Sequence, residues 1–308
     1  MADGQDKKID AATGTELKGH EWDGIAELDT PLPRWWLWTF YATIIFAIGY
    51  VIAYPAIPML HDYTRGMLGW SSRGALDKEL AAREAEIAPL RRAIADTAIT
   101  DLPGKPQLMQ AAVEGGRAAF KVHCVQCHGS GAAGAKGYPN LNDDDWLWGG
   151  DLATIEKTIT DGVRNPNHDA TRVSMMPAFG RDQLLTSAQV NDVVAHVRVI
   201  SRQDKASAAS QRGTQVFADN CAVCHGPDGK GTRALGAPNL TDGIWLYGGD
   251  AETIHETVWN SRQGVMPRWD DKLDKATIRM LATYVHSLGG GEATPVDETA
   301  DNEATARP

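Results

Sequence analysis

All four cysteines of this 308-residue chain lie in two short motifs, HCVQCHG and NCAVCHG. In each motif two cysteines stand three positions apart, and a histidine directly follows the second. Two thiols at this spacing can serve a redox switch, a zinc site or a haem. The residues concerned are Cys124, Cys127 and His128 in the first motif and Cys221, Cys224 and His225 in the second.

The setting of the motifs and their histidines decide between these uses. A thioredoxin-like pair expects a βαβ setting, and the chain shows no alternation of β-branched strands with helices. A zinc site built from two such pairs would not need a histidine after each. Cys-x-x-Cys-His is the attachment signature of haem c, with two thioether bonds and the histidine as an axial iron ligand. We therefore predict two covalently bound haem c groups, one attached at Cys124 and Cys127 and one at Cys221 and Cys224, with His128 and His225 on the irons.

The sequence around the two motifs is duplicated. FKVHCVQCHG is followed by PNL, DWLWGGD and SMMP, and FADNCAVCHG is followed by PNL, WLYGGD and GVMP. The copies differ by small loop changes, mainly an additional RNPNHDATRVS stretch in the first. A repeated order of this kind indicates a tandem duplication of one domain. We predict the two domains at residues 107–203 and 204–290.

A methionine followed by proline recurs late in each copy, at Met176 and Met266. A low-spin haem that only carries electrons needs both axial positions filled, and a thioether is a soft ligand that favours Fe(II). An isolated methionine more often fills a gap in a core. Because both methionines stand in register after a haem motif, we predict that they are the sixth iron ligands. Met175 competes for the first site, but the Met-Pro register favours Met176.

Glycine and proline positions in both copies suit the surroundings of a porphyrin. Gly129 and Gly226 let the chain pass where a side chain would collide. The carbonyl groups of Pro139 and Pro238 can accept a hydrogen bond from the second nitrogen of the ligand histidine and fix its orientation. Five other histidines are predicted to be ordinary packed or surface residues: His123, His168, His196, His255 and His286.

Two further glycines predict close helix crossings. Gly116 and Gly213 each stand eight residues before the first cysteine of their motif. A residue without a side chain lets two helices approach closely, so we expect each N-terminal helix to cross a C-terminal one. The expected partners are the helical stretches 191–200 for the first copy and 276–288 for the second.

Residues 35–60 predict a membrane anchor. No charge interrupts this stretch between Arg34 and His61, and tryptophan and tyrosine cluster toward its ends. As a helix it would measure roughly 39 Å, enough to cross a hydrocarbon core of about 30 Å. It begins too late and runs too long for a cleavable signal peptide. We predict a single-pass transmembrane segment.

The remaining segments follow from the anchor. The positive-inside rule barely distinguishes the two orientations. Covalent haem attachment takes place on the outer side of the bacterial cytoplasmic membrane, so residues 1–34 are expected in the cytoplasm and the haem domains in the periplasm. Residues 61–106 form a connecting segment with a charged, solvated helix, and residues 291–308 a disordered tail. The formal net charge of −10 comes mostly from the chain ends and says little about docking.

The stretch DTPLPRWWLWTFYATIIFAIGYVIAYP, followed by a charged helix and two haem motifs with DWLWGGD and WLYGGD, resembles the di-haem subunit III (CcoP or FixP) of cbb3-type cytochrome c oxidases. The resemblance covers nearly the whole chain from Trp22 to Gly290, and PLPRWW is its most specific part. It implies an all-α chain with a single N-terminal transmembrane helix and two tandem class I cytochrome c domains. It also implies the axial pairs His128 with Met176 and His225 with Met266.

The resemblance further implies a function. In that family the subunit takes electrons from a donor cytochrome c or the bc1 complex. It passes them through a mono-haem cytochrome c subunit to the catalytic haem-copper subunit, which reduces oxygen to water and pumps protons. The chain itself would not be an enzyme but an electron-transfer component in the bacterial inner membrane. Its partners would be those subunits, the donor and membrane lipid, with no nucleic acid.

Other classes of protein stay open from the sequence. A di-haem peroxidase needs one haem with an open or displaceable sixth position, and methionine in register at both sites argues against it. A haem-based redox or gas sensor should carry an output module, and none is visible. The closest alternative is a membrane-bound di-haem donor to another reductase or dehydrogenase. The PLPRWW entry to the anchor favours the oxidase subunit.

The paired motifs predict two covalent haems per chain. After extraction with acid acetone, mass spectrometry should find the protein heavier by about two haem masses, because thioether bonds survive the treatment. Replacing Cys221 and Cys224 together by alanine should leave one haem. A chain that releases all of its haem to the solvent would contradict the haem c assignment.

Overall fold

The structure is a computed structural model that describes residues 8–166 and 168–293. The chain divides into two compact units between Glu86 and Ile87, and each is described by itself. Of the predicted tail 291–308, residues 294–308 lie outside the described residues. Gly291, Glu292 and Ala293 lie inside, and Glu292 hydrogen bonds to Gly150 through both its backbone and its side chain, so Glu292 is attached to unit 2.

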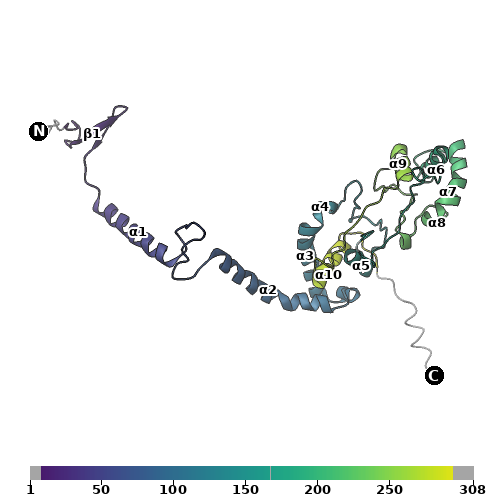
Figure 1. The fold of residues 1–308 in the computed structure, drawn as a ribbon, viewed down its shortest axis with the longest axis horizontal. Coiled ribbons are helices and arrows are strands. Elements are labelled where there is room, and N and C mark those ends of the chain that lie inside the picture. Colours follow the sequence, from purple (N-terminus) through teal and green to yellow (C-terminus); the bar gives the residue numbers. More distant parts are fainter. Residues whose placement is uncertain (1–7, 167, 294–308) are drawn as a thin grey trace, which may run out of the picture. The chain divides into compact units, whose positions relative to one another are not determined.

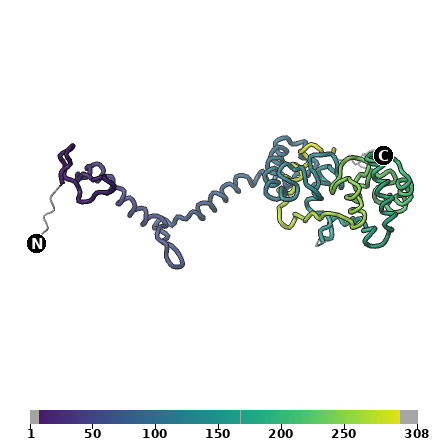
Figure 2. The backbone as a smooth tube through the Cα atoms, turned by 90° about the horizontal axis from the view of Figure 1, so that it is seen from above, coloured from purple at the N-terminus to yellow at the C-terminus, as the bar shows by residue number. Residues whose placement is uncertain are grey.

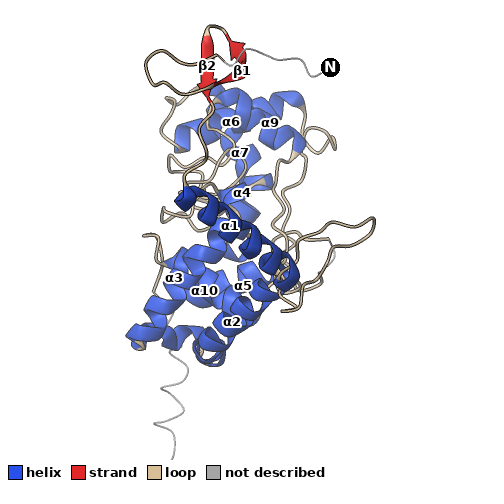
Figure 3. Cartoon of the chain, turned by 90° about the vertical axis from the view of Figure 1, so that its left-hand side faces the viewer, coloured by secondary structure: helices blue, strands red, loops and turns tan. Residues whose placement is uncertain are grey.

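Unit 1 begins with a β-hairpin, which the sequence analysis did not predict. Strands β1 (Leu17–Trp22) and β2 (Ile25–Leu28) pair antiparallel and are the two strands drawn in red in Figure 3. The turn between them is Asp23-Gly24, with φ of 50° and 83°. Asp-Gly is a favoured turn for a two-residue hairpin because both positions need positive φ.

The apolar helix α1 spans Arg34–Ala53 and is 20 residues long. At 1.5 Å per residue it measures about 30 Å, which matches a hydrocarbon core. None of its residues is buried in the protein, and among the described helices it alone is long and apolar enough to cross a membrane. The predicted segment 35–60 was too long. Tyr54 precedes Pro55 and takes extended angles, φ −115° and ψ 162°, because a following proline disfavours the helical region.

Helix α2 (Ser72–Asp96) begins in unit 1, and its last turns belong to unit 2. The prediction of a solvated helix is wrong for these turns. Ile94 is fully buried and packs with Ala112 and Met280. The carbonyl groups at the end of the helix accept hydrogen bonds from the Arg279 guanidinium, at 3.3 Å for Ile94 and 2.7 Å for Ala95. A 3-10 helix, η1 (Ile99–Gly104), follows.

Unit 2 contains the two copies of the repeat, with the same order of helices in each. A carboxylate begins the third helix of each copy: Asp151 accepts hydrogen bonds from the backbone of Ala153 and Thr154, and Asp250 from that of Thr253. The duplicated GGD run therefore ends in a helix N-cap. The first copy has α3 (Pro106–His123), α4 (Val125–His128), α5 (Leu152–Asp161) and α6 (Ser187–Ile200). The second has α7 (Ala208–Asn220), α8 (Ala222–His225), the 3-10 helix η2 (Arg233–Leu235), α9 (Ala251–Asn260) and α10 (Lys275–His286).

The last helix of each copy packs on the other copy. Figure 1 shows α10 beside α3 and α5, and α6 beside α7 and α9. In Figure 2 the yellow end of the chain accordingly lies among blue and teal segments. The two larger hydrophobic cores among the described residues each combine residues of both copies. Core 1 includes Phe120, Leu152, Ile155, Leu281 and Val285, and core 2 includes Val190, Val193, Phe217, Ile254 and Val258.

The predicted glycine crossings are present, but with exchanged partners. A Cβ atom on Gly116 would lie 1.9 Å from the carbonyl oxygen of Met280 in α10, and one on Gly213 would lie 1.9 Å from that of Asp192 in α6. The sequence predicted the opposite pairing. Because the copies are duplicates, both C-terminal helices present similar surfaces, and the pattern does not specify which copy each one joins. Residues 107–203 and 204–290 remain predicted repeats of sequence, and each core combines parts of both.

The crossing at Gly116 predicts a position that tolerates no side chain. Gly116→Ala places a methyl group against the α10 backbone, which cannot move aside as a flexible side chain can, and should destabilise unit 2 by about 1–3 kcal/mol. Gly104→Ala is the matched control, since a Cβ there meets no atom within 4 Å. Thermal unfolding of the detergent-solubilised protein measures the stability of each variant. Equal melting temperatures for the two variants would contradict the close crossing.

Candidate haem-binding sites

Both motifs adopt the same local geometry. Helix α3 ends at His123, and Cys124 separates it from the single turn α4. The Cys124 carbonyl accepts hydrogen bonds from the N–H groups of Cys127 at 3.2 Å and His128 at 2.9 Å. In the second motif the Cys221 carbonyl accepts the equivalent bonds at 3.1 and 2.9 Å. One helical turn places residues three and four apart on one face. Two thiols and an imidazole therefore lie on the same side, as attachment to one macrocycle requires.

The orientation of each histidine ring is fixed by a proline carbonyl. His128 Nδ1 lies 3.2 Å from the carbonyl oxygen of Pro139, and His225 Nδ1 lies 3.0 Å from that of Pro238. This confirms the contact predicted from the sequence. A carbonyl only accepts, so Nδ1 carries the proton and the Nε2 lone pair is available to an iron. Burial lowers the pKa of both histidines, partly offset by these bonds, so the neutral, metal-binding form is favoured.

The cysteine environment fits haem attachment better than zinc. Burial raises the pKa of Cys124 and Cys221 to about 11, and the neighbouring Cys127 and Cys224 add to the effect. A structural zinc site would need four protein ligands around the ion. Within residues 8–166 and 168–293, no three histidine, cysteine or acidic side chains gather into a metal-binding group. Gly129 and Gly226 turn the chain away after each histidine with φ of 78° and 77°.

The methionines lie on the opposite cores from those expected. Met266 packs against core 1, which also contacts Cys124, and Met176 packs against core 2, which contacts Cys221. This placement contradicts the pairing of His128 with Met176 and of His225 with Met266. The physical reason is the helix exchange, because each methionine precedes a C-terminal helix that joins the other copy. Met175 is 65% exposed, so the packing favours Met176 over Met175.

We call the segments that contain Met176 and Met266 the methionine loops. Backbone contacts hold each of them to the other copy. Met266 and Val163 exchange two hydrogen bonds, at 2.9 and 3.0 Å, in an antiparallel bridge. Gly162, with φ of 69°, precedes this bridge, and a Cβ there would lie 2.4 Å from the Met266 carbonyl oxygen. In the other loop the Met176 carbonyl accepts a hydrogen bond from the Ser261 hydroxyl. The exchange is therefore anchored at both methionines as well as in the cores.

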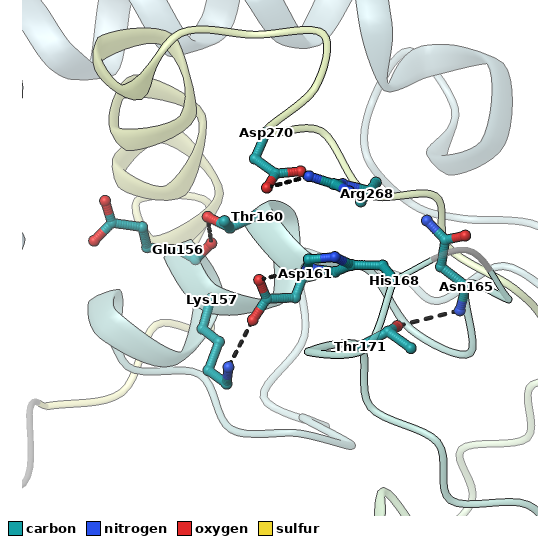
Figure 4. Close-up of polar contacts among 9 residues, drawn as sticks. All are labelled: Glu156, Lys157, Thr160, Asp161, Asn165, His168, Thr171, Arg268 and Asp270. Atoms are coloured by element: carbon teal, nitrogen blue, oxygen red, sulfur yellow. Dashed lines mark hydrogen bonds and ion pairs between the residues drawn. The ribbon is translucent and has the colours of Figure 1, made fainter.

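The stretch found only in the first copy packs beside the Met266 loop. Figure 4 shows Asp161, at the end of α5, between Lys157 and His168, with distances of 2.6 and 3.2 Å. Burial alone would raise the pKa of Asp161, but hydrogen bonds from these two residues lower it overall. The prediction of His168 as a surface residue is wrong, since its side chain is only 17% exposed. Arg268 and Asp270 form a second ion pair nearby.

The duplicated tryptophans, Trp146 and Trp245, have a structural role that their spacing alone does not predict. A Cβ on Gly150 would lie 2.3 Å from Trp146 Nε1, and one on Gly249 would lie 2.6 Å from Trp245 Nε1. Each indole therefore lies against its own glycine pair, which explains the common spacing. Trp146 Nε1 also donates to the carbonyl of Gly290 at 2.6 Å. The repetition marked these residues, and only the structure shows their contact.

The residues present fit haem c at both motifs: a pair of thiols whose first member is half-buried, an oriented neutral imidazole, and a methionine that packs on the same core. These sites and the helical cores define a c-type cytochrome with duplicated domains behind an apolar N-terminal helix. A family profile described as the N-terminal domain of cytochrome oxidase-cbb3, FixP, matches residues 14–61. A second, cytochrome c oxidase, cbb3-type, subunit III, matches residues 111–197 and 208–285.

Relatives agree along nearly the whole chain. The cbb3-type cytochrome c oxidase subunit CcoP of Cereibacter sphaeroides is 54% identical over 274 residues, covering 89% of this chain and 94% of that protein. Subunit FixP of Rhizobium meliloti is 51% identical over 292 residues, covering 95% of this chain and all of that protein. Subunit FixP of Azorhizobium caulinodans is 49% identical over 285 residues. The chain belongs to the family of subunit III of cbb3-type cytochrome c oxidases.

The crossed placement predicts which methionine serves which haem. In a variant that keeps only the first haem (Cys221→Ala with Cys224→Ala), Met266→His should lower the reduction potential by a sizeable part of the about 0.8 V that axial ligands span, because imidazole favours Fe(III). Met176→His in the same background is the control and should leave the potential nearly unchanged. Redox titration followed by absorbance measures the reduction potential of each variant. A large shift with Met176→His alone would restore the pairing within each copy.

Proposed function

We propose that this chain is the electron-transfer subunit of a cbb3-type cytochrome c oxidase and carries two covalent haem c groups. The observation that carries the proposal is the closed arrangement at both motifs. Each oriented histidine belongs to a motif whose first cysteine packs against the same core as a methionine. Two filled axial positions suit electron transfer and leave no place for a substrate at the iron.

Different residues would have different roles at each haem site. Bound haem c supplies a one-electron Fe(III)/Fe(II) couple. The proline carbonyls hold His128 and His225 in one tautomer and raise their basicity as ligands. The thioethers of Met176 and Met266 would hold the iron as soft ligands, which would keep water from it and raise the reduction potential. The protein thus sets potential and access, and the transfer itself is tunnelling between closed sites.

The chain is proposed not to reduce oxygen itself. Oxygen reduction in this class of oxidase needs a haem-copper centre, and copper prefers clustered imidazole ligands. Across the described ranges 8–166 and 168–293 no such cluster is present. The same closed sites disfavour a di-haem peroxidase, which needs a displaceable ligand. The nearest alternative, a membrane-bound donor to another reductase or dehydrogenase, shares these sites and differs in its partners.

The proposed partners follow from family membership. They are the catalytic haem-copper subunit, a mono-haem cytochrome c subunit, and a donor cytochrome c or bc1 complex. We propose that α1 crosses the bacterial inner membrane once, with the β1–β2 hairpin in the cytoplasm and unit 2 in the periplasm. The support is the apolar, unburied surface of α1 and the location of haem attachment outside the cytoplasmic membrane.

The exposed surface of α1 predicts an assembly interface. Trp35 and Trp38 are 70% and 73% exposed at the helix entrance, more aromatic surface than membrane retention requires. Replacing residues 34–53 with an unrelated apolar helix of 20 residues should preserve membrane attachment and haem content. It should reduce co-purification of the catalytic subunit and oxygen uptake driven by reduced cytochrome c.

A second variant serves as the control for this exchange. Replacing the β1–β2 hairpin (residues 17–28) with a flexible linker leaves α1 intact. Comparison of the two variants therefore distinguishes the contribution of the hairpin to assembly from that of α1. Normal assembly and respiration with the replaced helix would show that residues 34–53 only tether the chain. Failure of the unaltered, tagged chain to co-purify with any haem-copper subunit would contradict the proposed function itself.

A further inference from the structure

Arg164 occupies an unusual place in the stretch that only the first copy has. It follows the Gly162-Val163 turn after α5 and has φ of 54°, a left-handed conformation uncommon for residues other than glycine. Its backbone N–H donates to the carbonyl of Arg172 at 2.7 Å, which closes the inserted loop. A conformation of this kind persists only where surrounding contacts hold it. The contacts of the side chain are therefore of interest.

The Arg164 guanidinium joins the two methionine loops. Its Nε donates to the carbonyl oxygen of Gly264 at 2.7 Å, and its Nη1 donates to that of Ser174 at 3.1 Å. Gly264 stands two residues before Met266, and Ser174 two residues before Met176. The two acceptors are thus equivalent positions of the repeat. One side chain from the first copy bonds to the same point of both ligand-bearing loops.

The guanidinium is also a partly buried positive charge. Burial lowers the pKa of Arg164, yet a guanidinium stays protonated in proteins, so the charge persists. Among the described residues Arg164 forms no ion pair with a carboxylate, and its side-chain hydrogen bonds end on carbonyl groups. Oxidation of a haem adds one positive charge. A neighbouring uncompensated cation disfavours that addition and raises the reduction potential.

We propose that Arg164 is a shared positioning residue, which holds both methionine loops against the opposite cores and so sets the iron ligation of both haems with one side chain. The inference rests on the proposed ligation by Met176 and Met266. It assigns the inserted stretch of the first copy a role at both sites. Loss of the guanidinium should therefore weaken both methionine ligands together, although only one copy of the repeat carries it.

Neighbouring arginines provide the matched comparison. Arg172 lies in the same inserted stretch and is likewise half-buried, but its Nη1 donates to the carbonyl of Trp148 at 3.1 Å and its guanidinium lies over that indole at 5.1 Å. Arg262 bonds to Thr253 and Thr257 in α9. Neither side chain has a hydrogen bond to a methionine loop in the described structure. Arg172→Gln removes an equal charge without removing the link between the loops.

The test uses the intact chain with Arg164→Gln, Arg164→Lys and Arg172→Gln. The measurements are the Met–Fe(III) charge-transfer band, both reduction potentials, and the rate of carbon monoxide binding to the reduced protein. With Arg164→Gln we expect weakening of the band, a fall of both potentials and faster carbon monoxide binding. Arg164→Lys keeps the charge but not the two-pronged donor, so it should also weaken the band, with a smaller fall in potential. Arg172→Gln should change neither ligation signal.

The outcomes separate this inference from the proposed function. A shift at one haem only, an equal effect of Arg172→Gln, or unchanged spectra in both Arg164 variants would overturn the shared role while the unaltered chain still shows two methionine-ligated haems. If the unaltered chain lacks the methionine band, the proposed ligation fails first, and with it this inference. If Arg164→Gln does not accumulate, Arg164→Lys alone decides, since normal ligation in it contradicts the proposal.

Discussion

Unit 2 depends on the close contact between the first helix of each copy and the last helix of the other copy. At Gly116 helix α3 has no side chain, and the backbone of α10 occupies that space; at Gly213 helix α7 accepts α6 in the same way. Helices in such contact exclude water from both cores. Because the contact joins different copies, the chain must pass between the cores twice. The methionine loops are the two crossing segments, so the exchange decides where each methionine lies.

The two candidate sites are therefore not independent halves. Each takes its thiols and imidazole from one copy and its methionine from a segment that begins in the other. The bridge between Val163 and Met266 holds one of these segments, and the bond from Ser261 to Met176 holds the other. A single guanidinium, that of Arg164, lies between them. The two loops are thus linked through one side chain that donates hydrogen bonds to both.

Much of this arrangement could be read from the sequence, because the chemistry is local. The Cys-x-x-Cys-His turn, the contact of His128 with Pro139 and the small residue at Gly116 depend on neighbours or on residue size, and all appear as expected. The exchange could not be read, since duplicated surfaces are equally suitable partners for either copy. The end of α1 at Ala53 was missed because hydropathy continues past the proline that stops the helix. The hairpin turn at Asp23 was overlooked, although Asp-Gly signals it.

The exchange also orders the events by which the protein matures. Protein synthesis begins at the N-terminus, so Cys124, Cys127 and His128 are made long before Met266. By contrast, Met176 and α6 are already present when Cys221 emerges. The second site can thus close almost as soon as its motif is synthesised, whereas the first must wait for the end of the chain. Its closure spans a longer loop, which costs more entropy and slows folding. The copy that comes first in sequence is completed last.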